Sequence, residues 1–190
     1  ESDRAFAADV AGDSGRVVAI SPCSSQRARN FRNWRVDNFA AVIEHLEKRH
    51  GARIVLTGGP SELEKEYAEQ LAARSAAVNL AGRTTLKQLA AVIAAADLVI
   101  CPDSGPAHMA TALGTTVVGL YATSNPARTG PYLSQKFTIN RYPDAVMRYL
   151  AKNVADIAWG RRVRHPDAMD LVTVDDVVQS VDNFFVNRDI

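Results

Sequence analysis

The sequence is poor in cysteine and histidine, and none of the few it has are spaced as metal ligands. Its 190 residues include 2 cysteines, Cys23 and Cys101, and 4 histidines. Metal sites built on these residues use closely spaced pairs, so no structural or catalytic metal is expected. Each cysteine ends an apolar, strand-like stretch, and a buried free thiol is the expected state of both.

The chain also lacks a charge excess and a long apolar run. It has 22 basic against 21 acidic residues and a formal net charge of +1, whereas nucleic-acid-binding domains show a basic excess or stripe. Apolar runs such as 89–96 fall far short of the roughly 20 residues of a membrane span. No nucleic-acid partner and no membrane span are therefore expected.

The N-terminus and the glycine motifs exclude further classes. Residues 1–6 have neither the basic start nor the apolar core of a signal peptide, and no initiator Met, so the chain is expected to begin part-way through something longer or to have been processed. The phosphate-binding signatures GxxxxGK[ST] and GxGxxG do not occur. A P-loop enzyme is thereby excluded, and neither a conventional dinucleotide site nor a cofactor is expected.

Strand and helix signals alternate along the chain. Short, continuous apolar runs predict strands at 16–21, 53–57, 78–80, 98–101 and 117–120. Apolar stripes between them predict amphipathic helices, such as the one that carries Phe39, Val42, Ile43 and Leu46. Continuous apolar strands indicate a sheet covered on both faces, and the alternation indicates parallel βαβ units. The predicted fold class is α/β, a Rossmann-like doubly wound parallel sheet.

A single domain over 1–190 is expected, because this length can bury one sizeable core. Residues 1–15 would form a leading linker and 16–142 the Rossmann-like core, whose last part, 121–142, is rich in loops. Residues 143–190 would hold C-terminal helices, around 145–157 and 174–185. The basic segment 160–166 between these helices is predicted to be a solvated loop or, in the alternative, a contact for an acidic partner.

The loops that follow the first two predicted strands carry unusual residues, and ligands of open parallel sheets bind at such carboxyl ends. Loop 22–34 offers hydroxyls, guanidinium groups and backbone amides ahead of a helix, which suits phosphate but also an exposed polar loop. Loop 57–62 has paired glycines that let the backbone approach a ligand. Glu62 could accept hydrogen bonds from ribose hydroxyls; alternatively, Ser61 caps the next helix and Glu62 complements its dipole.

The loop after the fourth predicted strand, 102–110, contains several residues suited to helix capping or to ligand binding. Ser104 suits a helix N-cap, and Gly105 leaves room for a ligand whose diphosphate the helix amides would attract. Asp103, at a strand end, can hydrogen-bond sugar hydroxyls. A capping role for Asp103 and a core role for His108 are the alternatives. Such a density of special residues favours a binding function for this loop.

At these loops the sequence resembles glycosyltransferase family 9, the ADP-heptose:lipopolysaccharide heptosyltransferases. The runs PDSGPAHMA (102–110) and ALGTTVVGLY (112–121) are similar to the family's Asp-Ser/Thr-Gly…His…Ala-Leu-Gly block. TSNP (123–126) and GP (130–131) follow where the family has Thr-x-Pro and Gly-Pro, although Thr116 and Ala122 replace a common Pro and Gly. LTGGPSE (56–62), LAGRTTL (80–86) and MDLVTVDDV (169–177) are also similar, so the likeness extends over about 16–187.

The resemblance implies a donor-binding site in which Ser24 and Ser25 contact the phosphates. Arg32 stands where the family usually has a phosphate-binding Lys followed by x-Trp-Pro. Here the run reads RNWR (32–35), so both Lys and Pro are replaced. A guanidinium can bind a diphosphate through two parallel hydrogen bonds, which would preserve the contact.

The other loops match further donor-binding positions of the family. By this resemblance Glu62 is the acid that contacts the ribose, and Asp103 is the residue that holds the donor sugar. Ser104, Gly105 and His108 correspond to the diphosphate loop. No metal is implied, because an arginine and backbone amides can carry the charge of the diphosphate.

The family has a GT-B fold, in which two Rossmann-like domains face each other across a cleft and the N-terminal one binds the acceptor and supplies the catalytic carboxylate. With about 15 residues ahead of its first predicted strand, this chain is expected to be the donor half, its catalytic base lying in a missing N-terminal domain. It would not transfer sugar by itself.

The implied reaction is an inverting transfer of heptose from ADP-heptose to lipopolysaccharide core, in the cytoplasm or at the surface of the inner membrane. Two alternatives stay open. One is a nucleotide-binding module without its own activity, and the other is a GT-B enzyme that uses a UDP-sugar.

Overall fold

A computed structural model describes residues 1–24 and 30–188, and within them six parallel strands form one sheet. The strands are β1 (Val17–Ile20), β2 (Arg53–Leu56), β3 (Val78–Asn79), β4 (Leu98–Pro102), β5 (Thr116–Tyr121) and β6 (Ile139–Asn140). Their order is β3-β2-β1-β4-β5-β6, and every described pairing is parallel. The predicted Rossmann-like class is confirmed, with the change of winding direction between β1 and β4.

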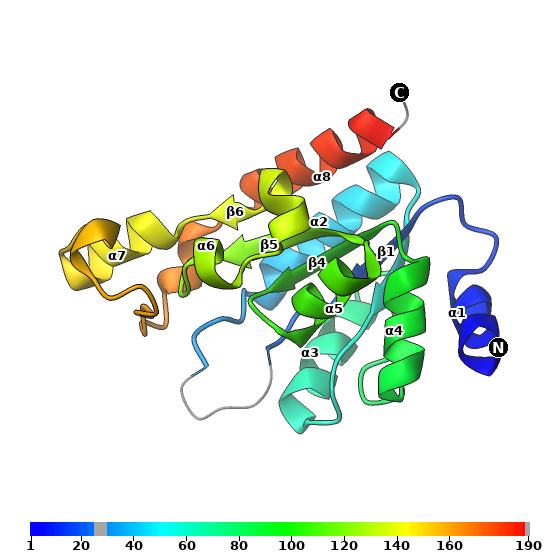
Figure 1. Cartoon of the computed structure of the whole chain (residues 1–190). Coiled ribbons are helices and arrows are strands. Elements are labelled where there is room, and N and C mark those ends of the chain that lie inside the picture. The colour runs from blue at the N-terminus through cyan, green and yellow to red at the C-terminus, as the bar shows by residue number, and fades with distance from the viewer. Residues whose placement is uncertain (25–29, 189–190) are drawn as a thin grey trace.

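Helices cover both faces of this sheet (Figure 1). They are α1 (Ser2–Ala11), α2 (Val36–His50), α3 (Glu62–Ala72), α4 (Leu86–Ala95), α5 (Gly105–Leu113), α6 (Pro126–Thr129), α7 (Tyr142–Leu150) and α8 (Val174–Arg188). Three short 3-10 helices, η1 (Tyr132–Phe137), η2 (Val154–Asp156) and η3 (Ala168–Leu171), complete the described regular structure. No helix in the described part of the chain is both long and apolar enough to cross a bilayer.

The strands divide their side chains between two hydrophobic cores. Val18 and Ile20 of β1 pack into the core that contains α2, α3 and α8, whereas Val17 and Ala19 pack into the core of α1, α4 and α5. β2, β4 and β5 alternate in the same way. Both faces are buried, which explains why the strands read as continuous apolar runs in the sequence.

Several helix ends form as their residues predict. Thr85 begins α4 in a capping box with Gln88, and Ser61 caps α3 by accepting from the amide of Glu64. Gly51 and Gly114 end α2 and α5 in the left-handed region, at φ 59° and 80°. A residue with a Cβ pays strain in that conformation, so glycine is favoured there.

Two segments differ from the sequence-based expectation. Residues 1–15, expected to be a linker, contain α1, because Ala7 and Val10 lie on one helical face and are buried against α4. The region expected to be rich in loops contains β6, whose Ile139 and Asn140 pair with the end of β5. A strand of two residues is too short to leave an apolar run in a sequence.

The helix predicted around 145–157 begins and ends earlier in the structure, where it is α7. α7 begins at Tyr142, with Pro143 in its first turn, where a missing amide hydrogen costs nothing. It ends at Ala151, a residue in the left-handed region at φ 52°. Only the short η2 follows, so the basic segment 160–166 begins after an irregular stretch.

Trp34 ties the loop after β1 to the C-terminal part of the chain. Its side chain is fully buried, its indole nitrogen donates to the carbonyl of Val172 at 2.9 Å, and its ring packs edge-on against Phe39. Arg35 forms a bidentate pair with Asp170 beside it, and this hydrogen bonding lowers the pKa of the Asp170 carboxyl. The end of this loop next to Arg32 is thereby tied to the C-terminal part of the chain.

We expect Trp34→Phe to lower the free energy of unfolding by about 2 kcal/mol, because a buried carbonyl loses its donor and a cavity remains. Urea unfolding followed by circular dichroism would measure the change. Trp159→Phe is the matched control: Trp159 is 62% exposed, so its replacement should change stability by less than about 0.5 kcal/mol. Equal losses in the two variants would contradict the anchoring role of Trp34.

Candidate functional site

A pocket of about 570 Å³ opens at the carboxyl edge of the sheet, where the winding direction changes between β1 and β4. This is the edge at which open α/β sheets bind ligands. Loops after β1, β2 and β4 form its floor, and the start of α4 forms one wall. Thr129 and Arg162, from two later segments, complete it. The lining residues are Ser21, Cys23, Ser24, Arg32, Gly58, Gly59, Glu64, Thr84, Thr85, Leu86, Leu89, Asp103, Ser104, Gly105, Pro106, His108, Thr129 and Arg162.

The loop after β1 contributes Ser24 and Arg32. Ser24 is buried, and two asparagines hold it: its hydroxyl donates to Asn30 Oδ1 at 2.9 Å, and its amide donates to Asn33 Oδ1 at 3.0 Å. Two of the three predicted phosphate contacts of this loop, Ser24 and Arg32, therefore line the pocket. Ser25 lies outside the described residues.

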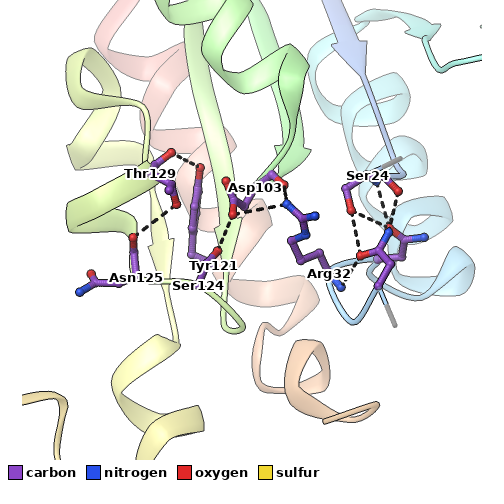
Figure 2. A network of polar contacts seen from close by, with 9 residues as sticks. Ser24, Arg32, Asp103, Tyr121, Ser124, Asn125 and Thr129 are labelled. Atoms are coloured by element: carbon purple, nitrogen blue, oxygen red, sulfur yellow. Dashed lines mark hydrogen bonds and ion pairs between the residues drawn. The ribbon is translucent and has the colours of Figure 1, made fainter. Parts of the chain in front are cut away.

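Asp103 lies at the centre of a polar network at the end of β4 (Figure 2). Its side chain is 4% exposed, and its Oδ2 accepts from the Ser124 hydroxyl at 2.8 Å and lies 3.6 Å from Arg32 Nη1. The same guanidinium nitrogen donates to the Asp103 carbonyl at 2.8 Å. Arg32 and Asp103, distant in the sequence, are thus joined across the pocket floor.

The helix that follows Asp103 presents its N-terminus to the pocket. Ser104 occupies the N-cap position, but its hydroxyl does not cap the helix. That oxygen is buried and has no hydrogen-bond partner among the described residues. A methyl group added at Gly105 would meet open space. His108 is exposed on the pocket wall. All four site residues predicted in this loop, Asp103, Ser104, Gly105 and His108, therefore line the same pocket.

Glu62 lies apart from the other predicted site residues. Its side chain is 89% exposed, pairs with Lys65 at 2.9 Å and does not line the pocket. Glu64 faces the pocket from the same helix, where its carboxylate accepts from the Gly59 amide at 2.9 Å and from the Ser61 hydroxyl at 2.7 Å. Of these two acids, therefore, Glu64 lines the pocket and Glu62 does not, and the predicted role of Glu62 stays a prediction.

Sequence reasoning missed two groups of lining residues. Leu86 and Leu89 form an apolar wall, and their helical spacing in the sequence indicated only core packing. Leu86 is nevertheless 72% exposed at the pocket mouth. Arg162 reaches the pocket from the basic segment 160–166, which was predicted to be a solvated loop or a contact for an acidic partner.

The thiols near the pocket are unsuited to nucleophilic chemistry. Burial raises the pKa of Cys23 to about 12, and the Glu64 carboxylate raises it as well. Burial also raises the pKa of Cys101 to about 12, against a smaller lowering by Ser104. Both cysteines are free and buried, as predicted.

One described group has the residue types for a metal ion, and it lies outside the pocket. His45 and His50 of α2 each contact Asp182 Oδ1 of α8 through Nε2, at 2.7 and 2.6 Å. No metal-ligand spacing is visible in the sequence for this group, because Asp182 comes from a distant helix. The contacts themselves join α2 to α8 across one face of the sheet.

Together, the fold and the pocket define a Rossmann-like domain whose site combines two arginines and a helix N-terminus with an apolar wall. The cationic groups and amides suit a phosphate, and the apolar wall suits a flat ring. The carboxylate of Asp103 lies between them and is available to hydroxyl donors.

The chain belongs to glycosyltransferase family 9 (heptosyltransferase), which it matches over residues 1–152. It is 33% identical over 180 residues to the lipopolysaccharide core heptosyltransferase OpsX of Haemophilus influenzae, covering 94% of this chain and 51% of that protein.

Two solved structures share the fold. One, described as the E. coli ADP-heptose lps heptosyltransferase II, has a TM-score of 0.72 at 21% identity, and the match covers 100% of this chain and 53% of that one. The other, E. coli heptosyltransferase WaaC with ADP, has a TM-score of 0.65 at 21% identity and covers 96% of this chain and 48% of that one. The chain thus spans about half the length of the relatives it matches, as a half of the GT-B fold would.

We expect both thiols to resist alkylation at about pH 8, because a rise in pKa from 9.0 to about 12 lowers the thiolate fraction about a thousandfold. Iodoacetamide labelling followed by mass spectrometry would measure the rates. The same chain in guanidinium chloride is the control and should label at both positions. Rapid labelling of Cys23 in the folded protein would contradict its burial.

Proposed function

We propose that this chain is the donor-binding half of a heptosyltransferase that binds ADP-heptose. The observation that carries the proposal is the placement of Asp103, a buried carboxylate fixed between Arg32 and Ser124 beside the N-terminus of α5. Such a site offers positive groups to a diphosphate and an acceptor oxygen to the sugar attached to it. The family membership and the ADP-bound relative support the choice of nucleotide.

In this proposal the diphosphate lies against the start of α5. The amides of the first helical turn and the positive end of the helix dipole face it. The buried Ser104 hydroxyl donates to a phosphate oxygen and gains there the partner that it lacks. Arg32 and Arg162 approach from the other side of the pocket. These groups stabilise the negative charge that the departing nucleoside diphosphate develops, without a metal.

The base and the sugar occupy the two ends of the pocket. The exposed face of Leu86 and Leu89 packs against the adenine ring. Glu64 lines the pocket and Glu62 does not, so we assign the ribose contact to Glu64. Asp103 Oδ2 is engaged by Ser124, so Oδ1 is the oxygen that accepts hydrogen bonds from the heptose. This arrangement holds the anomeric carbon toward the open side of the pocket.

Transfer also needs an acceptor and a base on that open side. A general base must lie within hydrogen-bond reach of the acceptor hydroxyl, and the carboxylates that line this pocket, Asp103 and Glu64, are both assigned to the donor. We assign the base to the half of the GT-B fold that the relatives have in addition to the matched region. The full reaction is then inverting transfer of heptose to lipopolysaccharide core, at the cytoplasmic side of the inner membrane.

Calorimetric titration of the 190-residue chain should show tighter binding of ADP than of UDP or GDP. The physical reason is that adenine, unlike guanine and uracil, carries no exocyclic oxygen and therefore suits the apolar wall of Leu86 and Leu89. Equal affinity for all three nucleotides would contradict the adenine assignment. Absence of binding to any of them would contradict the donor-binding proposal itself.

We expect Arg32→Ala to weaken ADP binding by about 1.5–3 kcal/mol, because a charge-assisted contact to the diphosphate is lost. Adenosine offers no phosphate, so its affinity should change much less. Arg74→Ala is a matched control, since Arg74 pairs with Asp37 on the surface and does not line the pocket. An equal loss for adenosine and ADP would show that Arg32 supports the loop instead.

A further inference from the structure

A second hollow adjoins the donor pocket, and arginines line it. It has a volume of about 630 Å³ and is formed by Arg128, Leu150, Gly160, Arg161, Arg162 and Arg164; we name it the arginine hollow. Arg162 lines both cavities. A cleft too narrow to admit a water molecule shares lining residues with the two, and Trp159 lies at this cleft. The site proposed above uses only Arg162 of these residues.

The positive charge of the arginine hollow is uncompensated in the described part of the chain. No carboxylate lines it. None of the side chains of Arg128, Arg161, Arg162 and Arg164 forms a hydrogen bond or a salt bridge with a described residue. The chain as a whole has a net charge of +1, so four guanidinium groups around one hollow are a local concentration of charge. Such a concentration favours an anionic ligand.

Acidic side chains nearby do not neutralise the arginine hollow. Asp156 lines the next surface depression, together with Arg161, but there it accepts a hydrogen bond from Asn153 at 3.0 Å. Asp144 lies 3.7 Å from Arg141, and Asp167 lies 3.8 Å from His165. Each described acid of this region is thus paired with a group outside the hollow.

The backbone holds the arginines in place. Val163 is buried, and its amide donates to the carbonyl of Thr123 just after β5 at 2.9 Å. The hydroxyl of Tyr142 donates to the carbonyl of Arg161 at 2.6 Å. A methyl group at Gly160 would lie 3.5 Å from the guanidinium carbon of Arg128, so these two segments are in contact. The backbone that carries these arginines is thus held in place before a ligand binds, which lowers the cost of ordering it.

The neighbouring Trp159 indicates what kind of anion fits. It is an apolar ring that is 62% exposed in the wall of the cleft, whereas the other tryptophan, Trp34, is fully buried. Aromatic rings pack against the apolar faces of sugar rings, and guanidinium groups bind phosphates and carboxylates through paired hydrogen bonds. An exposed indole beside several arginines therefore suits a sugar that carries an anionic group.

We propose that the arginine hollow binds a phosphate or carboxylate group of a sugar whose ring stacks on Trp159. If the proposed function holds, this sugar belongs to the acceptor, because the hollow adjoins the donor pocket through Arg162. A flat basic surface would suit a membrane. The concave shape and the single aliphatic side chain, Leu150, favour a discrete ligand.

The test uses the 190-residue chain and two double variants of equal charge. R161Q/R164Q removes two arginines that line the hollow but not the donor pocket. R4Q/R49Q removes two exposed arginines elsewhere and serves as the control. Glucose 6-phosphate and glucuronate are titrated against glucose and inorganic phosphate, with Trp159 fluorescence as the readout. ADP affinity is measured in parallel by calorimetry.

We expect saturable fluorescence changes with glucose 6-phosphate and glucuronate. R161Q/R164Q should bind both about tenfold more weakly or worse, while R4Q/R49Q keeps the affinity and all three proteins bind ADP alike. Equal affinity for inorganic phosphate and glucose 6-phosphate would overturn the assignment to a sugar. Equal losses in the two variants would overturn the site.

A vesicle assay separates the remaining alternative. Binding to phosphatidylglycerol vesicles that depends on Arg161 and Arg164, without saturable binding of either sugar anion, would overturn the proposal in favour of a membrane contact. Failure of ADP binding with sugar-anion binding intact would instead count against the donor-binding function alone.

Discussion

The contact between Arg32 and Asp103 holds the two sides of the pocket floor together. Arg32 comes from the loop after β1 and Asp103 from the end of β4, the strands between which the sheet changes its winding direction. Neighbouring strands bring the loops close, but only side-chain contacts fix their separation. Breaking one partner of a buried ion pair is strongly destabilising, so this pair sets the width of the site.

The charge balance of the site follows from that pair. Asp103 is 4% exposed, and a carboxylate so deeply buried is tolerated only with partners. Arg32 and Ser124 supply them, and Arg32 also lines the pocket together with Arg162 and the N-terminus of α5. The pocket can thus hold a fixed negative group for hydroxyls and a positive region for phosphates at adjacent places.

The sequence predicted the sheet and most of the site because those features have local causes. The strands are continuous apolar runs, and Ser24, Arg32, Asp103, Ser104, Gly105 and His108 follow strand ends, which meet at one edge of a parallel sheet. The roles assigned to them, and the contact of Ser25, stay predictions. The orientation of α3 decides that Glu64 and not Glu62 lines the pocket. Arg162 reaches the pocket because of a long-range backbone contact between Val163 and Thr123. Neither property is visible in a local pattern.

Trp34 brings together parts of the chain that are 138 residues apart, since its partner is Val172. Contacts between such distant segments close large loops and form late in folding. The sheet can therefore assemble before the loop after β1 has its final shape. During synthesis the strands and helices would therefore form ahead of a complete pocket, which would have to wait until Val172 has left the ribosome.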